Sequence, residues 1–276
     1  MEIVFGGISS LLYGAADFLG GEGARRAPAA AIVFWAGAIS FPLILAVALL
    51  TGGEASTADY LVGAAAGASG AVGLVFLFAG LGRGRAASVA PVAAALAAVL
   101  PVVVAVVEGE RPSALAWTGV IVAVPAIVLC ASVGEPGGAD RSSTVYGVVA
   151  GLGFGGFTAL IRFTGEESNL LPLVASRAST ILIVVILGGL GVWKLVRLGE
   201  TPRPIVVGNA VLDVAGNVAL LLAIRAGSLA LAAVAASFYP AVTVIIARVV
   251  NSEHLRGRQV VGLGLTLIAM TAIAIG

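Results

Sequence analysis

Long apolar runs separated by short polar breaks dominate the sequence. Each run is about 20 residues long, the length that a helix needs to cross a hydrocarbon core of roughly 30 Å. Charged residues, prolines and glycine-rich segments bound the runs. The predicted spans are 3–21, 29–51, 59–81, 86–107, 114–133, 144–163, 170–194, 204–225, 229–250 and 258–275. We therefore expect an all-α integral membrane protein with about ten transmembrane helices.

One polar stretch divides this pattern in two. Residues 134–143 are rich in Gly, Ser and charged side chains, the composition of a linker. The other breaks are short, so successive helices should pack as antiparallel neighbours, with no separate soluble domain. We expect two units of five helices each, residues 1–135 and residues 143–276.

The two units share an order of landmarks. Residues 61–133 align with residues 204–276 at an offset of 143 positions, and the first two spans of each unit align at an offset of 141. The superposed pairs are Gly73 with Gly216, Gly84 with Gly227, Glu110 with Glu253, Gly119 with Gly262, Gly6 with Gly147 and Gly14 with Gly155. Because each unit holds an odd number of spans, the second unit must enter the membrane from the opposite side. We expect two inverted five-helix repeats around a midplane site, an architecture that favours an alternating-access transporter over an enzyme.

Composition supports this class and excludes others. The chain is 60% hydrophobic and only 11% charged, whereas a soluble domain is about a quarter charged. A net charge of +1 without a basic cluster argues against a nucleic-acid partner. The single cysteine, Cys130, lies in an apolar run and the single histidine, His254, lies in a loop. We therefore expect no metal site, no cofactor and no enzymatic activity.

Glycines recur at intervals of four in two of the predicted helices. Gly147, Gly151 and Gly155 form one series, and Gly63 and Gly67 form another. This spacing places small side chains on one helix stripe, where two helices can approach closely. The series predicts how the bundle packs and says nothing about a substrate.

A polar stripe in the eighth span is the main candidate for a binding site. Asn209, Asp213 and Asn217 recur at intervals of four, which favours one helix face. Polar groups inside a membrane are costly and therefore candidates for function. If the stripe faces the cavity, it offers a carboxylate and two amides to a polar substrate. The alternative is a buried clamp between helices, with Asp213 neutralised by Arg177, and the two interpretations are compatible.

A few further residues complete the candidate site. Asp17 and Asp213 are the plausible proton-carrying residues if transport is coupled to protons, and an uncoupled facilitator or exchanger remains an alternative. Tyr13, Trp35 and Tyr239 are the aromatic candidates for substrate binding. Tyr239 precedes Pro240, and a helix kinked by proline often lines a cavity.

The end of each unit resembles the EamA family of the drug/metabolite transporter superfamily. The segments that carry the resemblance are Tyr239-Pro240-Ala241-Val242-Thr243 up to Arg248, Glu253-His254-Leu255, Gln259-Val260-Val261-Gly262, and in the first unit Glu110-Arg111-Pro112-Ser113 followed by Gly119. Arg177 also resembles an arginine that the family often carries early in the second helix of a repeat. Trp35 and Ala36 stand at that level in the first unit, which departs from the pattern.

The resemblance implies a ten-helix permease without naming its cargo. We expect export of small metabolites, with amino-acid-like solutes favoured by the polar stripe. A multidrug or cationic-compound exporter coupled to protons is the alternative, and a non-transporting scaffold is a third. The expected setting is the bacterial inner membrane, in which the protein is multi-pass and either a monomer or a homodimer, and the expected partners are a small molecule and lipid.

Two arguments about orientation disagree. If the N-terminus is inside, ten loop Lys and Arg residues lie outside and three lie inside, leaving out Arg177 and Arg248 as intramembrane. The positive-inside rule therefore favours termini outside. The family resemblance implies that both termini are cytoplasmic.

Overall fold

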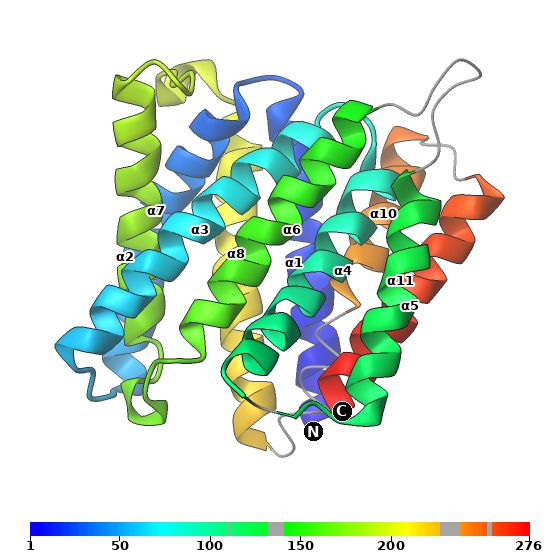
Figure 1. The fold of residues 1–276 in the computed structure, drawn as a ribbon. Coiled ribbons are helices and arrows are strands. Elements are labelled where there is room, and N and C mark those ends of the chain that lie inside the picture. The colour runs from blue at the N-terminus through cyan, green and yellow to red at the C-terminus, as the bar shows by residue number, and fades with distance from the viewer. Residues whose placement is uncertain (110, 132–140, 227–237, 253–255) are drawn as a thin grey trace.

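The computed structural model describes residues 1–109, 111–131, 141–226, 238–252 and 256–276 as a bundle of helices (Figure 1). Within these ranges the long helices are α1 (Glu2–Ala24), α2 (Ala29–Thr51), α3 (Thr57–Leu81), α4 (Ala86–Val107), α5 (Ala114–Ala131), α6 (Arg141–Ile161), α7 (Leu171–Gly189), α8 (Arg203–Ala226), α10 (Tyr239–Asn251) and α11 (Gly257–Ile275). Two short 3-10 helices, η1 (Glu166–Ser168) and η2 (Leu198–Glu200), flank α7.

The prediction of an all-α, multi-pass chain is confirmed. The described residues contain no strand, and six of the helices are long and apolar enough to cross a membrane. These six are Ala29–Thr51, Thr57–Leu81, Ala86–Val104, Ser143–Ile161, Leu171–Gly189 and Gly257–Ile275, and shorter apolar helices lie at Ala114–Leu129 and Tyr239–Asn251. The ninth predicted span, 229–250, is described from Tyr239 onward. Glu110, Glu253 and His254 lie outside the described residues.

The seventh helix ends five residues before its predicted end at 194. It stops at Gly189, and Gly191 follows with φ +73, a conformation that residues with a Cβ rarely adopt. The Val192 N–H donates to Leu187 O, and the Gly191 N–H donates to Gly188 O. These bonds satisfy carbonyls that the helix end leaves free. The apolar run continues past the helix, so hydropathy alone could not locate this end.

The first and third helices of the two units pack reciprocally. α1 packs along α8, and α6 packs along α3. α2 packs against α7, and α5 packs against α11. Each unit therefore buries its first helix against the other unit.

The predicted glycine stripes lie at close helix contacts, which confirms their packing role. Gly147, Gly151 and Gly155 of α6 face α4, where a methyl group at Gly147 would come 2.9 Å from the Val92 Cβ. Gly63 and Gly67 of α3 face α7. The small residues allow the backbones to approach at these places.

α1 is held differently on its two sides. On the side of α8 and α10, three buried side-chain donors bond to backbone carbonyls across the helix contacts. They are Asn209 Nδ2 to Ala16 O (2.7 Å), Ser9 Oγ to Gly216 O (2.9 Å) and Thr243 Oγ1 to Gly14 O (3.1 Å). On the side of α3, Gly20 and Gly21 lie against Phe78 and Leu81. Hydrogen bonds thus fix the position of α1 relative to the second unit.

Both chain termini lie at one end of the bundle, which we call the terminal end (Figure 1). Loops of the two units are bonded together there. The Asn169 side chain donates to Gly52 O at 2.9 Å, and the Gly165 N–H donates to Asp59 Oδ1 at 2.8 Å. Asp59 also caps α3 by accepting from the Ser56 N–H at 2.7 Å. These bonds join the start of α3 to the loop before α7.

Candidate functional site

A cavity of about 310 Å³ lies inside the bundle, between helices of both units. Residues of α1, α2, α3, α6, α7, α8 and α10 line it. Its polar lining includes six residues of α1, α7, α8 and α10. They are Tyr13, Asp17, Arg177, Asp213, Asn217 and Tyr239. Five of the seven predicted substrate-binding residues and both predicted proton-carrying residues are therefore in contact with one cavity.

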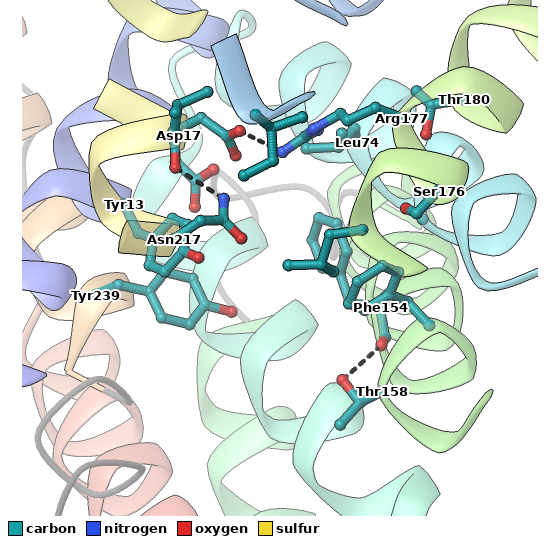
Figure 2. Close-up of a pocket in the computed structure, with 16 residues that line it drawn as sticks. Tyr13, Asp17, Leu74, Phe154, Thr158, Ser176, Arg177, Thr180, Asn217 and Tyr239 are labelled. Carbon is teal, nitrogen blue, oxygen red and sulfur yellow. Dashed lines mark hydrogen bonds and ion pairs between the residues drawn. The ribbon is translucent and has the colours of Figure 1, made fainter. Parts of the chain in front are cut away.

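An ion pair between α7 and α8 lies at the centre of the polar lining. The Arg177 Nη2 donates to the Asp213 Oδ2 (Figure 2). Both side chains are mostly buried, at 19% and 23% exposed. Because a charge in this environment is costly alone, each partner stabilises the other. The pair is at once the clamp and part of the cavity lining, so the two interpretations of the stripe coexist.

Asn217 continues the polar surface one turn along α8. Its Nδ2 donates to the Asp213 backbone carbonyl at 2.8 Å, which fixes the amide against its own helix. The amide oxygen has no hydrogen-bond partner among the described residues. An acceptor therefore remains available to a bound molecule.

Asp17 lies on α1, one turn after Tyr13, and faces the same cavity. Figure 2 shows Tyr13, Asp17, Asn217 and Tyr239 on one side of the cavity and Phe154 and Thr158 on the other. Within the described part of the chain, Asp17 takes part in no hydrogen bond and no ion pair. It is a carboxylate without an ion-pair partner among the described residues at the cavity.

Two predicted residues lie elsewhere. Asn209 is not part of the cavity lining, because its side chain is 5% exposed and bonds to Ala16 O. The Trp35 Nε1 donates to Val196 O at 2.9 Å, which connects α2 to the segment after α7. In this structure both side chains contact neighbouring backbone and not the cavity.

The remaining lining residues were not among the predicted binding residues. Phe154 and Phe157 of α6 give an apolar surface, and Thr158, Ser176 and Thr180 add hydroxyl groups. A signal was present in the spacing, since Thr158 follows Phe154 by four and Thr180 follows Ser176 by four. The two members of each pair therefore lie on the same helix face, and all four residues line the cavity.

The cavity extends from the middle of the bundle towards the terminal end. Thr158 lies in the last turn of α6 and Leu173 in the first turn of α7, both near that end. Towards the opposite end, Gly20 and Gly21 of α1 pack tightly on α3. The charged groups therefore lie between the cavity, which extends towards the terminal end, and the tight contact of α1 with α3 on the other side.

Metal chemistry has no support in the described residues. No group of three or more His, Cys, Asp or Glu side chains that could hold a metal ion occurs among them. Among the described residues that line the cavity, the ionisable groups are two carboxylates, one guanidinium and two phenols. Such groups can bind a polar or charged solute by hydrogen bonds and ion pairing.

Comparison with known proteins places the second unit in a family and supports the fold of the whole chain. The model described as the EamA-like transporter family matches residues 141–275. No curated protein matches the chain. Among solved structures 11 chains match, and one crystal structure is 15% identical with a TM-score of 0.50, covering 97% of this chain and 98% of that chain. At this identity the likeness shows the fold alone.

The family match covers the helices that carry the central ion pair. Arg177, Asp213 and Asn217 all lie within it. Members of this family are transporters, which at family level agrees with a chain that is not an enzyme. Residues 141–275 belong to the EamA-like transporter family, and this match, together with the apolar helices, indicates a multi-pass membrane transporter of the drug/metabolite superfamily.

Proposed function

We propose that this transporter is a permease that exports small, amino-acid-like metabolites by alternating access through the cavity described above. One observation carries the proposal. Helices of both units line one cavity in which an ion pair, a second carboxylate and an amide lie near the middle of the bundle. Charged groups at that depth are characteristic of substrate and ion pathways.

We propose further that residues 1–135 and 143–276 are inverted repeats. The reciprocal packing of α1 on α8 and of α6 on α3 supports this arrangement. So do the lining positions. Equivalent positions at the repeat offsets line the cavity in both units, namely Tyr13 with Phe154, Asp17 with Thr158, Gly70 with Asp213, and Leu74 with Asn217. Two such bundles around a central site can expose it to each side in turn.

The polar lining suits both ends of an amino-acid-like solute. Arg177 has several N–H donors, and the bond to Asp213 uses one of them. The others can bind a carboxylate group. Asp17 and the free amide oxygen of Asn217 can accept from an ammonium group.

The unpaired carboxylate of Asp17 favours a second candidate, an exporter of cationic compounds coupled to protons. Asp17 could exchange a proton for a cationic substrate, whereas Asp213 is held by Arg177. Proteoliposomes with an entrapped pH indicator test this coupling. A substrate gradient that moves no protons in the wild type would remove the coupled mechanism.

Counterflow in proteoliposomes tests the permease itself. We expect proteoliposomes preloaded with unlabelled substrate to accumulate at least one radiolabelled amino acid or amine. The variant Asp213→Asn should lose most of that uptake. Val211→Ala is the matched control, because Val211 lies on α8 but is 48% exposed on the outer surface of the bundle. Purified protein that moves no amino acid, nucleoside or cationic dye in either direction would overturn the proposal.

The cellular setting follows from the same proposal. We place the protein in a bacterial inner membrane, as a monomer or a homodimer. Lys194, Arg197 and Arg203 lie at the end of the bundle opposite the termini, so the positive-inside rule turns that end to the cytoplasm. A fluorescent reporter that folds only in the cytoplasm, fused to the C-terminus, should then stay dark. Bright cells would instead support the orientation that the family resemblance implies.

A further inference from the structure

We infer that Asp17 recognises the transported solute by binding a positively charged amino group of that solute. A carboxylate on the same solute is not required for recognition. This inference rests on the proposed function, because it names the chemical class that the same cavity accepts. It is carried by the charges, the contacts and the two unlike sides of the cavity.

The charges of the lining do not cancel. Three described lining residues carry a charge when ionised in the ordinary way, namely Asp17, Arg177 and Asp213. Arg177 and Asp213 neutralise each other. One carboxylate is left over, and a carboxylate without a partner at membrane depth is costly. A cationic group on the solute supplies the missing charge.

The surroundings of Asp17 suit an ammonium group in particular. An ammonium has three N–H donors and no acceptor. The acceptors on this side of the cavity include the Asp17 carboxylate, the free amide oxygen of Asn217, the hydroxyl oxygens of Tyr13 and Tyr239, and the Asp213 oxygen that Arg177 does not use (Figure 2). The rings of the two tyrosines also attract cations by their π faces.

The backbone that carries Asp17 is held in place before any solute binds. Its helix is bonded to α8 and α10 through Asn209, Ser9 and Thr243. The bond from Asn209 ends on Ala16 O, the residue directly before Asp17. A preorganised acceptor loses little conformational entropy on binding, so it discriminates well.

The opposite side of the cavity receives the rest of the solute. Phe154 and Phe157 of α6 present aromatic rings there, and Leu74 of α3 adds an aliphatic surface. A cavity of about 310 Å³ is at the small end for ligand sites. The class that fits is therefore a small amine with an apolar or aromatic body.

A carboxylate on the solute is in a different situation. The guanidinium of Arg177 is already engaged by Asp213. An added carboxylate would therefore gain only the remaining donors of Arg177 and would meet the negative charges of Asp17 and Asp213. We expect an amine and the corresponding amino acid to be accepted, and the corresponding acid without the amino group to be rejected.

Three probes that share one side chain test the inference: phenethylamine, phenylalanine and phenylpropionate. Competition against an accumulated radiolabelled substrate in proteoliposomes gives an affinity for each. In the wild type we expect phenethylamine to compete at least as well as phenylalanine. Phenylpropionate should compete at least about tenfold more weakly than either. Asp17→Asn should abolish this preference for the amino group, and Asp17→Glu should restore part of it.

The possible failures are distinguishable. Wild type that transports nothing overturns the proposed function. Wild type that transports but prefers the acid, or needs the carboxylate, overturns the inference alone, and so does Asp17→Asn with an unchanged preference. Thermal unfolding in detergent shows whether each variant is folded, and Val211→Ala is carried through every measurement as the control. If Asp17→Asn does not fold, Asn217→Ala serves instead, and it should weaken phenethylamine and phenylalanine but not phenylpropionate.

Discussion

In the proposed repeat, the helices α1 and α8 correspond to α6 and α3, and the two pairs line one cavity with unlike side chains. Asp17 faces the cavity from α1, and Thr158 stands at the equivalent position of α6. Asp213 faces it from α8, and Gly70 stands at the equivalent position of α3. Both carboxylates belong to the side of α1 and α8, whereas the guanidinium of Arg177 reaches the cavity from α7, which packs against α3. A solute in the cavity would therefore meet carboxylates on one side and uncharged residues of α3 and α6 on the other.

The largest effect is expected from removing the charge partner on α8. Asp213→Ala leaves the Arg177 guanidinium buried without its carboxylate, which should cost about 3 kcal/mol of stability. Transport should fall to background. Thermal unfolding and counterflow measure the two effects. In the double variant Arg177→Met with Asp213→Leu, stability should return without transport, and a double variant that transports would show that the ion pair is not part of the binding site.

Exchanging the charge between the two sides sharpens the comparison further. Asp17→Thr should lower uptake of phenethylamine about tenfold or more, because a charge-assisted bond is lost. Adding Thr158→Asp to that variant moves the carboxylate to the equivalent position of the other unit. We expect uptake of the amine to recover in part. No recovery, with both variants folded, would mean that the two positions are not equivalent in the transport cycle.

A smaller effect is expected on the apolar side. Phe154→Ala removes an aromatic ring that a large substrate body contacts, so the KM for phenethylamine should rise several-fold, as the burial of apolar surface is lost. Small amines such as methylamine should compete unchanged. Equal losses for large and small amines would place the role of Phe154 in helix packing and not in binding.

The smallest effect on transport is expected at Asn209. Asn209→Ala breaks the buried bond to Ala16 O and should cost about 1 to 3 kcal/mol of stability. The equivalent residue of α3 is the buried Ala66, which makes alanine a natural replacement. Below the unfolding temperature we expect the substrate preference to remain. A changed preference for the amino group would show that the position of Asp17 depends on this bond.

The sequence alone was sufficient to predict the helices, but it predicted only part of the residues that line the cavity. Hydropathy located most ends of the described helices to within three residues, because span length is set by the bilayer, but α7 ends five residues before its predicted end. The spacing of the polar stripe placed Asp213 and Asn217 together. Each step of four residues turns about 40° beyond a full turn, so Asn209 and Asn217 differ by about 80° around the axis of α8. This rotation points Asn209 at α1 and away from the cavity.

The aromatic residues show a second limit of predicting the cavity lining from the sequence. Trp35 and Phe154 look alike in an apolar run, yet Phe154 lines the cavity and Trp35 bonds to Val196 O. Which of them reaches the cavity depends on the helix opposite, and on how closely small residues such as Gly73, which lies against Phe154, allow it to approach. Contacts of this kind join residues far apart in the sequence, so no local pattern contains them.

The bonds that hold α1 also have a consequence for synthesis. Ser9, Gly14 and Ala16 are made at the start of the chain, but their partners on α8 and α10 leave the ribosome only after more than half of it. The first helix must therefore wait in the membrane without these partners until the second unit is inserted. Cutting the gene between the units would give a first product that cannot complete its own fold, and the two products should become stable only when both are made in the same cell.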